Sequence, residues 1–294
     1  MDAADLRIFE AVARLGGMGR AAEALHTVQS NVTARIRQLE DELGTPLFRR
    51  LPRGVDTTAA GRRLLPYAQR IARLLEDARR AVTDDGVPQG PLVIGALETS
   101  TALRLSRPLA AYAAAYPDVD LTLRTGTTCE LIAQVLDGAL EGAFVCGPIA
   151  HPDLHATSVF TEELALLTAP SVRSLDELTA RGDVRIVVLR AGCSYRQRLE
   201  ELLARRGIAA PRVLEFGTVE ALFGCVAANL GITLLPRALI GPVWQEGRVA
   251  VHRLPPADAL VQTMFVRRRD AHLSSALSAF LAMLRPAEQI AAAE

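Results

Sequence analysis

The chain has 294 residues, enough for two or three domains, and its 33 basic residues, all of them arginine, equal its 33 acidic residues in number. This balance argues against a uniformly basic nucleic-acid binder, although residues 1–84 carry a small excess of arginine. No apolar run reaches transmembrane length and the N-terminus is acidic, unlike a signal peptide, so we expect a cytoplasmic protein without membrane contact.

The N-terminal segment predicts three helices. The first is expected to be capped by Asp2 or Asp5 and to run to about Leu15, where two glycines end it. Residues 21–40 then predict two helices joined by a sharp corner at residues 26–28. The apolar residues of each helix recur at helical spacing, and they are Ala21, Ala22 and Leu25 followed by Val32, Ile36 and Leu39.

The other face of the second of these two helices carries hydrogen-bonding side chains and no acidic residue. These side chains are Gln29, Ser30, Asn31, Thr33, Arg35 and Arg37. Glutamine and asparagine suit adenine edges in a DNA major groove, and a helix N-terminus favours a nearby phosphate. The alternative is an ordinary amphipathic helix pair with a solvated face, and the spacing alone does not decide between the two.

A β-hairpin is expected next, with strands at residues 47–50 and 55–58 around a turn at residues 52–54. Arg50 and Arg53 would lie at the tip of this hairpin, where they suit a DNA backbone or a narrow minor groove. The alternative is a solvated hairpin with surface arginines.

An ordered series of residues between Leu6 and Gly61 resembles the winged helix-turn-helix of LysR-type transcriptional regulators. The matching residues are Leu6, Phe9, Val12, Ala21-Ala22, Leu25-His26, Gln29, Ser30, Val32, Ile36, Leu39-Glu40, Leu43-Gly44, Pro46-Leu47-Phe48-Arg49-Arg50, Arg53-Gly54-Val55 and Thr58-Ala59-Ala60-Gly61. The chain departs from the family at Gly19, which weakens an expected helix cap, and at Ser30, where proline is common. The resemblance implies that residues 1–58 bind double-stranded promoter DNA, with the hairpin as the wing.

One long helix is expected from Ala59 to about Thr83, with Pro66 near its start. Apolar residues recur along it four and three apart, the heptad seam of a coiled coil, at Leu64, Ala68, Ile71, Leu75, Ala78 and Val82. We expect this seam to pair with a second copy of the chain, so that two helix-turn-helix units read two half-sites. The alternative is that it packs on its own domain. The resemblance implies a dimerising linker helix at residues 59–87 and dimers that commonly pair into tetramers.

From residue 88 onward strands alternate with helices, which predicts an α/β fold with largely parallel, helix-covered sheets. Strands are expected at residues 92–97, 119–124, 142–146, 164–168, 185–189, 213–216, 232–235, 249–254 and 261–267, and helices at 102–116, 130–136, 195–205, 219–228 and 273–284. Residues 88–294 resemble the LysR-family effector domain, which has the bilobed fold of type 2 periplasmic solute-binding proteins. The resemblance implies lobe I at about 90–160 and 266–294, lobe II at about 161–265, and hinge closure on a ligand.

Hydroxyl groups and one thiol follow several of the expected strands. Because ligands of open α/β sheets bind beyond the carboxyl ends of strands, near helix N-termini, these residues are the candidate effector contacts. They are Thr99, Ser100, Thr101, Thr127, Thr128, Cys193, Ser194 and Thr218. Such groups suit a small organic anion, although Glu98 and Glu220 would oppose one. The alternative is that each hydroxyl is an ordinary helix cap.

Two other side-chain sets leave a thiol- or metal-responsive sensor of the same architecture as an alternative. The chain has no CxxC motif, which argues against a disulfide framework or a zinc ribbon for Cys129, Cys146, Cys193 and Cys225. Cys193 and Cys225 fall in the expected lobe II and form a possible redox pair. His151 and His155 could bind a metal, but we expect a polar surface loop there.

No Ser-His-Asp set, glycine-rich phosphate loop or pair of carboxylates indicates catalysis, and we expect no cofactor. The sequence therefore predicts a homo-oligomeric, sequence-specific regulator of transcription, modulated by a small molecule in the interlobe cleft. A solute-binding or enzymatic protein with an accessory N-terminal domain is the remaining alternative.

Overall fold

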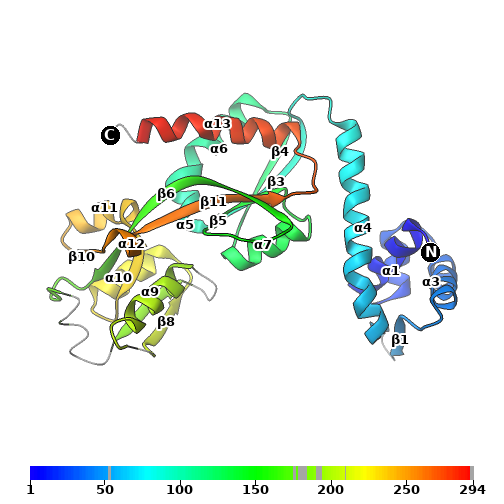
Figure 1. The fold of residues 1–294 in the computed structure, drawn as a ribbon, viewed down its shortest axis with the longest axis horizontal. Coiled ribbons are helices and arrows are strands. Elements are labelled where there is room, and N and C mark those ends of the chain that lie inside the picture. Colours follow the sequence, from blue (N-terminus) through cyan, green and yellow to red (C-terminus); the bar gives the residue numbers. More distant parts are fainter. Residues whose placement is uncertain (52–53, 175–176, 178–183, 190–193, 209, 292–294) are drawn as a thin grey trace. The chain divides into compact units, whose positions relative to one another are not determined.

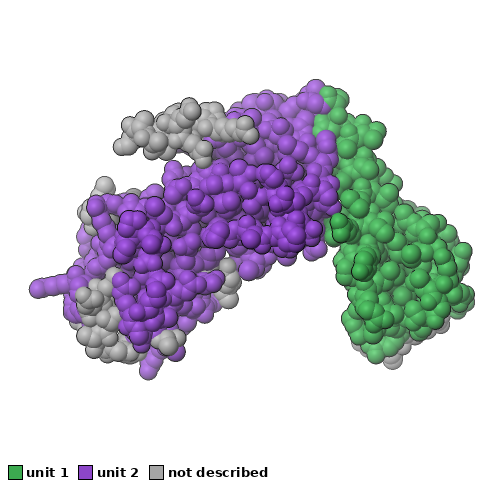
Figure 2. Space-filling view, viewed as in Figure 1, with its two compact units in different colours: residues 1–85 green, residues 86–294 purple. Residues whose placement is uncertain are grey.

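The computed structural model describes residues 1–51, 54–174, 177, 184–189, 194–208 and 210–291, without the side chains of residues 50, 242–245 and 285–291. The chain divides into two compact units, Met1–Asp85 and Gly86–Glu294 (Figures 1 and 2). Within the described residues, none of the helices combines the length and the apolar character that a membrane crossing requires.

The first unit consists of three short helices, a two-stranded hairpin and one long helix. In chain order these are α1 (Ala3–Leu15), α2 (Met18–Ala24), α3 (Gln29–Leu43), β1 (Phe48–Leu51), β2 (Gly54–Thr57) and α4 (Ala59–Thr83). Phe9, Val32 and Ala68 have no exposed surface, so α1, α3 and α4 share one core. This core holds α3 in place while the opposite face of that helix remains in solvent.

The ends of these helices follow from local chemistry. Asp2 and Asp5 form a reciprocal capping box at the start of α1, with side chain to N–H distances of 2.8 and 3.0 Å. The N-cap of α2 is Gly17, not Gly19, and it forms no side-chain hydrogen bond. His26 adopts a φ of 52°, which places the left-handed turn between α2 and α3 where the sequence predicted a corner.

Two hydrogen-bonded turns explain several residues of the helix-turn-helix resemblance. The Glu40 carboxylate accepts the N–H of Leu47 at 2.6 Å and so closes the loop between α3 and β1. The Thr58 hydroxyl accepts the N–H of Gly61 at 3.0 Å and donates to the Pro46 carbonyl at 2.8 Å. A Cβ on Gly61 would lie 2.3 Å from the Leu47 carbonyl oxygen, so this close approach requires glycine.

The heptad seam of α4 divides into two parts. Leu64, Ala68 and Ile71 pack against the helical core of their own unit, as the alternative interpretation predicted. The remaining three seam residues are exposed, with 43% exposure for Leu75 and 86% for Val82. Only the second part of the seam is therefore available to another helix.

The second unit is an α/β structure. Its strands are β3 (Gly90–Ala96), β4 (Val119–Thr125), β5 (Gly142–Cys146), β6 (Leu154–Thr168), β7 (Arg185–Leu189), β8 (Arg212–Phe216), β9 (Thr233–Pro236), β10 (Ala250–Arg253) and β11 (Leu260–Arg268). Its helices are α5 (Glu98–Ser100), the π-helix η1 (Thr101–Leu105), α6 (Ser106–Ala115), α7 (Thr128–Leu136), α9 (Ser194–Ala204), α10 (Val219–Ala227), α11 (Arg237–Gln245), α12 (Pro256–Ala259) and α13 (Ser275–Ala291). The sequence did not predict α5, α11 or α12.

The large sheet is mixed, so the prediction of largely parallel sheets is wrong for it and holds only for the separate two-stranded sheet, in which β7 and β8 are parallel. Its strand order is β10-β6-β11-β5-β3-β4, with β9 also paired to β6. The pairs of β3 with β4 and β5 are parallel, whereas β11 runs antiparallel to β5 and β6, and β6 runs antiparallel to β9 and β10. The reason is that the chain leaves the first half of the unit along β6 and returns along β11, in opposite directions (Figure 1).

The strand β6 begins at Leu154, earlier than the predicted Leu164, and His155 therefore lies in a strand instead of a surface loop. Its first part pairs with β11, and its last part pairs with β9 and β10. It thus joins two hydrophobic clusters. We call lobe I the part of this unit around Tyr112, Phe144 and Phe280, and lobe II the part around Leu166 and its neighbours.

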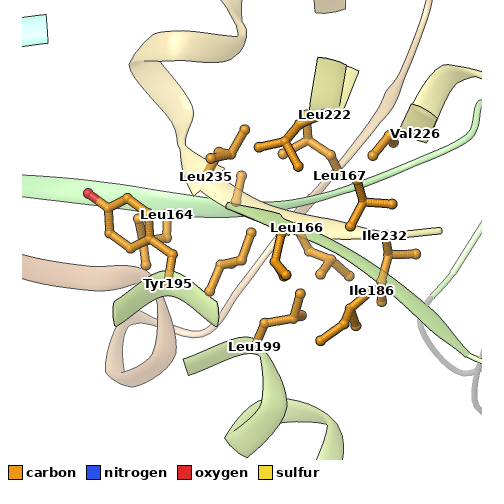
Figure 3. Packing of buried hydrophobic residues seen from close by; sticks show 14 of the residues in the cluster. Leu164, Leu166, Leu167, Ile186, Tyr195, Leu199, Leu222, Val226, Ile232 and Leu235 are labelled. Atoms are coloured by element: carbon orange, nitrogen blue, oxygen red, sulfur yellow. The ribbon is translucent and has the colours of Figure 1, made fainter. Parts of the chain in front are cut away.

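In lobe II the cluster forms between the end of β6 and the strands and helices around it (Figure 3). Leu166, Ile186 and Leu199 are buried and come from β6, β7 and α9. Tyr195 lies at the edge of this cluster with its hydroxyl oxygen directed away from it. The start of α9 is therefore anchored by apolar packing, which positions the polar residues beside it.

Candidate nucleic-acid interface and ligand cavities

The exposed face of α3 carries most of the predicted base-reading residues. Gln29, Ser30, Asn31 and Arg37 are exposed, and Thr33 is half-buried. A groove of about 680 Å³ runs beside this face, lined by Gly17, Met18, Gly19, Arg20, Gln29, Thr33, Arg37, Leu51, Gly54 and Val55. The groove is bounded by α2, α3 and the hairpin, so one concave surface presents hydrogen-bonding groups and two guanidinium groups.

Arg35 does not belong to this face. Its Nε lies 3.0 Å from Asp5 Oδ1, and one of its terminal nitrogens lies 3.4 Å from Asp2 Oδ1. The guanidinium therefore holds α3 against the start of α1, and we remove Arg35 from the candidate base contacts. The sequence pattern grouped it with its neighbours because helical spacing alone does not show which flank of a helix meets another helix.

Arg20 on α2 was not predicted as a site residue. Its guanidinium donates to the Gly16 carbonyl at 3.0 Å, and the same oxygen accepts the N–H of Val55 at 3.1 Å. Arg20 thus lies where the hairpin meets the helices and lines the groove. The sequence signal for Arg20 is that it is an arginine on the helix that precedes the predicted recognition helix.

The hairpin itself forms as predicted, with Arg50 paired to Val55 across it. Arg53 lies outside the described residues, as does the side chain of Arg50. Gly54 has a φ of 110°, and a Cβ there would lie 2.4 Å from the Gly16 carbonyl oxygen. The base of the hairpin can approach the helices this closely because residue 54 has no side chain.

In the second unit two of the predicted effector hydroxyls lie close to hydroxyls of α9. Thr99 Oγ1 lies 3.4 Å from the Tyr195 hydroxyl oxygen, and Thr128 Oγ1 lies 3.1 Å from Ser194 Oγ. Thr128 also accepts the N–H of Cys146 at 3.3 Å. These contacts join the starts of α5 and α7 in lobe I to the start of α9.

The other predicted effector residues are engaged locally or are not described. Thr101 donates to a carbonyl one turn earlier, Thr127 caps α7 in a capping box, and exposed Thr218 caps α10. Thr127 and Thr218 therefore fit the interpretation as helix caps, whereas Thr101 bonds back to the Leu97 carbonyl. Ser100 is buried, and Cys193 lies outside the described residues.

Two cavities adjoin the start of α9, and Ser194 lines both. The first, of about 540 Å³, is also lined by Thr99, Thr127 and Tyr195 and by the acidic residues Glu98 and Glu130. The second, of about 520 Å³, is also lined by Thr128, Cys129, Cys146, Arg196 and Arg198. Both volumes are in the range of small-molecule sites.

Comparison with known proteins assigns the chain to a family. The model for "Bacterial regulatory helix-turn-helix protein, lysR family" matches residues 3–62, and that for "LysR substrate binding domain" matches residues 85–289. The HTH-type transcriptional regulator GltR of Bacillus subtilis is 43% identical over 285 residues, which cover 97% of this chain and 96% of GltR. The chain belongs to the LysR family.

Solved LysR-family structures share the fold of this LysR-type regulator. The structure of full-length CbnR with its target DNA is 25% identical, with a TM-score of 0.60, over 97% of this chain and 99% of CbnR. ArgP from Mycobacterium tuberculosis is 20% identical, with a TM-score of 0.70, over 98% of this chain and 97% of ArgP. The predicted architecture, a helix-turn-helix domain followed by an α/β effector-type domain, is confirmed.

Membership of the LysR family makes this chain a DNA-binding regulator of transcription and not an enzyme. The comparisons do not favour the thiol- or metal-responsive alternative. Burial raises the pKa of the Cys146 thiol, and hydrogen bonding with Ser194 and the nearby Arg198 charge offset this in part. Cys129, Cys146 and Cys225 are free thiols, and no set of three metal-binding side chains lies together within the described ranges of this LysR-type regulator.

Proposed function

We propose that this LysR-type regulator binds promoter DNA as a homo-oligomer and changes its DNA contacts when a small-molecule effector binds between its two lobes. The observation that carries the DNA-binding part is the groove beside α3, which combines amide, hydroxyl and guanidinium groups on one concave surface. Groups of these kinds suit base edges and phosphates in a major groove.

In this proposal Gln29, Ser30, Asn31 and Thr33 face base edges, and Arg37 contacts the edge of the groove or the backbone. Their exposure on α3 supports this assignment. Arg50 and Arg53 of the wing, together with Arg20, would supply the phosphate contacts that fix orientation on the duplex without reading sequence.

The oligomer and the effector complete the proposal. The exposed part of the α4 seam supports pairing with a second copy, and CbnR, to which the chain is similar, is solved in complex with its target DNA. A ligand that binds one arrangement of the lobes more tightly than another shifts the population of arrangements and so the placement of the DNA-binding units. A regulator of promoters in a bacterium would act in the cytoplasm.

Fluorescence anisotropy with DNA from the upstream region of its own gene tests the DNA-binding assignment. We expect Gln29→Ala to reduce the preference for this DNA over random duplex by about 1–3 kcal/mol, because one base-edge contact is lost. Gln38→Ala, which removes the same side chain from an exposed position near the other end of α3, is the matched control and should leave the preference unchanged. Equal loss of binding to specific and random DNA in Gln29→Ala would overturn the assignment.

A further inference from the structure

We infer that the cavity beside Arg198, and not the cavity beside Thr99, binds a small carboxylate anion. This inference rests on the proposed function, because the anion would then be an effector. The two cavities have similar volumes, about 520 and 540 Å³, and share Ser194. They differ in the charges that line them, and this difference decides which of them accepts an anion.

The cavity beside Thr99 opposes an anion. Glu98, exposed at the start of α5, and Glu130 of α7 line it, and its described lining contains no arginine, lysine or histidine. Glu130 already accepts the N–H and the hydroxyl of Thr127, at 2.8 and 3.0 Å. A carboxylate in this cavity would lie near two like charges without a compensating cation among the described lining residues.

The cavity beside Arg198 contains a positive charge that the described protein does not neutralise. Half-buried Arg198 reaches the Gly147 carbonyl at 3.4 Å, and none of the described carboxylates lies within ion-pair distance of it. Arg196, on the same helix and in the same cavity, differs because its Nε lies 2.9 Å from Glu200 and a terminal nitrogen lies 3.5 Å from Glu215. A guanidinium has five donors, so Arg198 keeps donors for a bidentate carboxylate.

Two hydroxyls and two helix ends lie beside this charge. Thr128 and Ser194 begin α7 and α9, helices of nine and eleven residues, and their hydroxyl oxygens are 3.1 Å apart. Either hydroxyl can donate to a ligand oxygen, and both helix N-termini favour negative charge. Cys146 stays a neutral thiol at this wall, so it adds no competing negative charge.

The acidic residues of α9 limit the charge of the ligand. Glu200 is paired with Arg196, but exposed Glu201 accepts only from the neutral amide of Gln197, at 3.1 Å. The charges that remain on the described lining of the cavity are therefore Arg198 and Glu201, one of each sign. A compact carboxylate suits this balance better than a multiply charged phosphate ester.

Two measurements on the full-length protein test this site, with propionate and succinate as probes at constant ionic strength. The first is the shift in melting temperature, and the second is the rate at which iodoacetamide labels Cys129, an exposed cysteine that lines the cavity. We expect at least one probe to raise the melting temperature and to slow labelling of Cys129, while labelling of Cys225 in α10 is unchanged.

The variants localise the effect to one guanidinium. Arg198→Gln should weaken probe binding about tenfold or more, since a charge-assisted contact is lost. Arg198→Lys should retain part of the affinity, and Arg205→Gln, at an exposed arginine just after α9 that is not among the described lining residues, should bind as the wild type does. Undiminished binding to Arg198→Gln, protection that is absent at Cys129, or no response to either probe would each overturn the inference.

The DNA assay separates this inference from the proposed function. Wild type and Arg198→Gln should select the upstream DNA equally well without probe. Selective DNA binding together with no carboxylate binding would overturn the anion site alone, whereas a wild type that shows no DNA preference would overturn the proposed function.

Discussion

Glycine 54 shows how one residue controls the candidate DNA-binding surface. Its φ of 110° and the 2.4 Å that would separate a Cβ from the Gly16 carbonyl oxygen leave no room for a side chain. The neighbouring N–H of Val55 reaches the same oxygen at 3.1 Å, as does Arg20 at 3.0 Å. The hairpin and the helices therefore meet at one carbonyl group, and the groove beside α3 depends on that contact.

We expect Gly54→Ala to destabilise the first unit by about 1–3 kcal/mol, because the added methyl group combines backbone strain with a clash against backbone. Thermal unfolding followed by circular dichroism measures this loss. Gly224→Ala is the control, since a Cβ at this exposed position of α10 meets nothing within 4 Å and alanine favours a helix. A Gly54→Ala variant as stable as the wild type would show that the hairpin can move away from the Gly16 carbonyl oxygen without loss of stability.

Glycine 19 gives a physical meaning to a departure from the family pattern. A Cβ at this position would lie 3.3 Å from Gln29 Oε1, so the missing side chain leaves space beside the first candidate base-reading residue. Sequence comparison with the family identified the difference, but the neighbour that it affects was visible only in three dimensions.

At the scale of elements, the two parts of the α4 seam have different surroundings. Its first seam residues complete the core of their own unit, and its last seam residues, Leu75, Ala78 and Val82, are exposed. A heptad pattern reports only which residues share a face of a helix, so it predicted one continuous interface. The structure assigns half of that face to the protein's own helices.

Leu75→Arg should therefore disrupt oligomers without unfolding the chain, because Leu75 is 43% exposed and lies outside the helical core. Light scattering coupled to size exclusion measures the mass, and circular dichroism checks the fold. Arg70→Glu, a charge reversal at an exposed position outside the seam, should leave the mass unchanged. An unaltered oligomer in Leu75→Arg would exclude this part of α4 as the interface.

The strand β6, which runs between the two lobes, is joined to η1 by an ion pair whose carboxylate is buried. Glu162 is 4% exposed and accepts from Arg104 Nε at 2.8 Å, while the guanidinium carbon of Arg104 lies 6.0 Å from the centre of the Phe160 ring. Arg104 belongs to the π-helix η1, which follows Thr99 at the first cavity. The Arg104–Glu162 ion pair thus joins β6 to the helix that follows the wall of this cavity.

At the scale of the whole molecule, each of the two units has its own hydrophobic clusters. The cluster around Phe9 and Val32 lies in residues 1–85, and the clusters around Phe144 and Leu166 lie in residues 86–294. A unit with its own core is expected to fold independently of the rest of the chain.

A fragment of residues 86–294 should accordingly unfold cooperatively and respond to small carboxylates as the full chain does. It should not select the upstream DNA, since every candidate base contact lies in residues 1–85. Circular dichroism melting and anisotropy provide the two measurements. A fragment without a cooperative transition would show that the second unit needs the first in order to fold.

The local patterns of the chain were sufficient for most of its elements, although not for α5, α11 and α12, and an ordered series of residues indicated its family. Asp2, the glycines after α1, the spacing of Val32, Ile36 and Leu39, and the heptads of α4 depend on neighbours within a few residues, which a sequence displays directly. The alternation of strands and helices followed from these patterns, whereas the helix-turn-helix was identified from the resemblance to the LysR family.

Only the tertiary structure decided how distant residues share one surface. Arg35 pairs with Asp5, and β6 and β11 run antiparallel. Arg196 pairs with Glu200 and Glu215, whereas Arg198 has no carboxylate partner among the described residues. Each of these outcomes depends on segments that are far apart in the chain or on side-chain geometry that spacing does not encode. Long-range packing determines which polar groups are neutralised, and the groups that remain free define the candidate site.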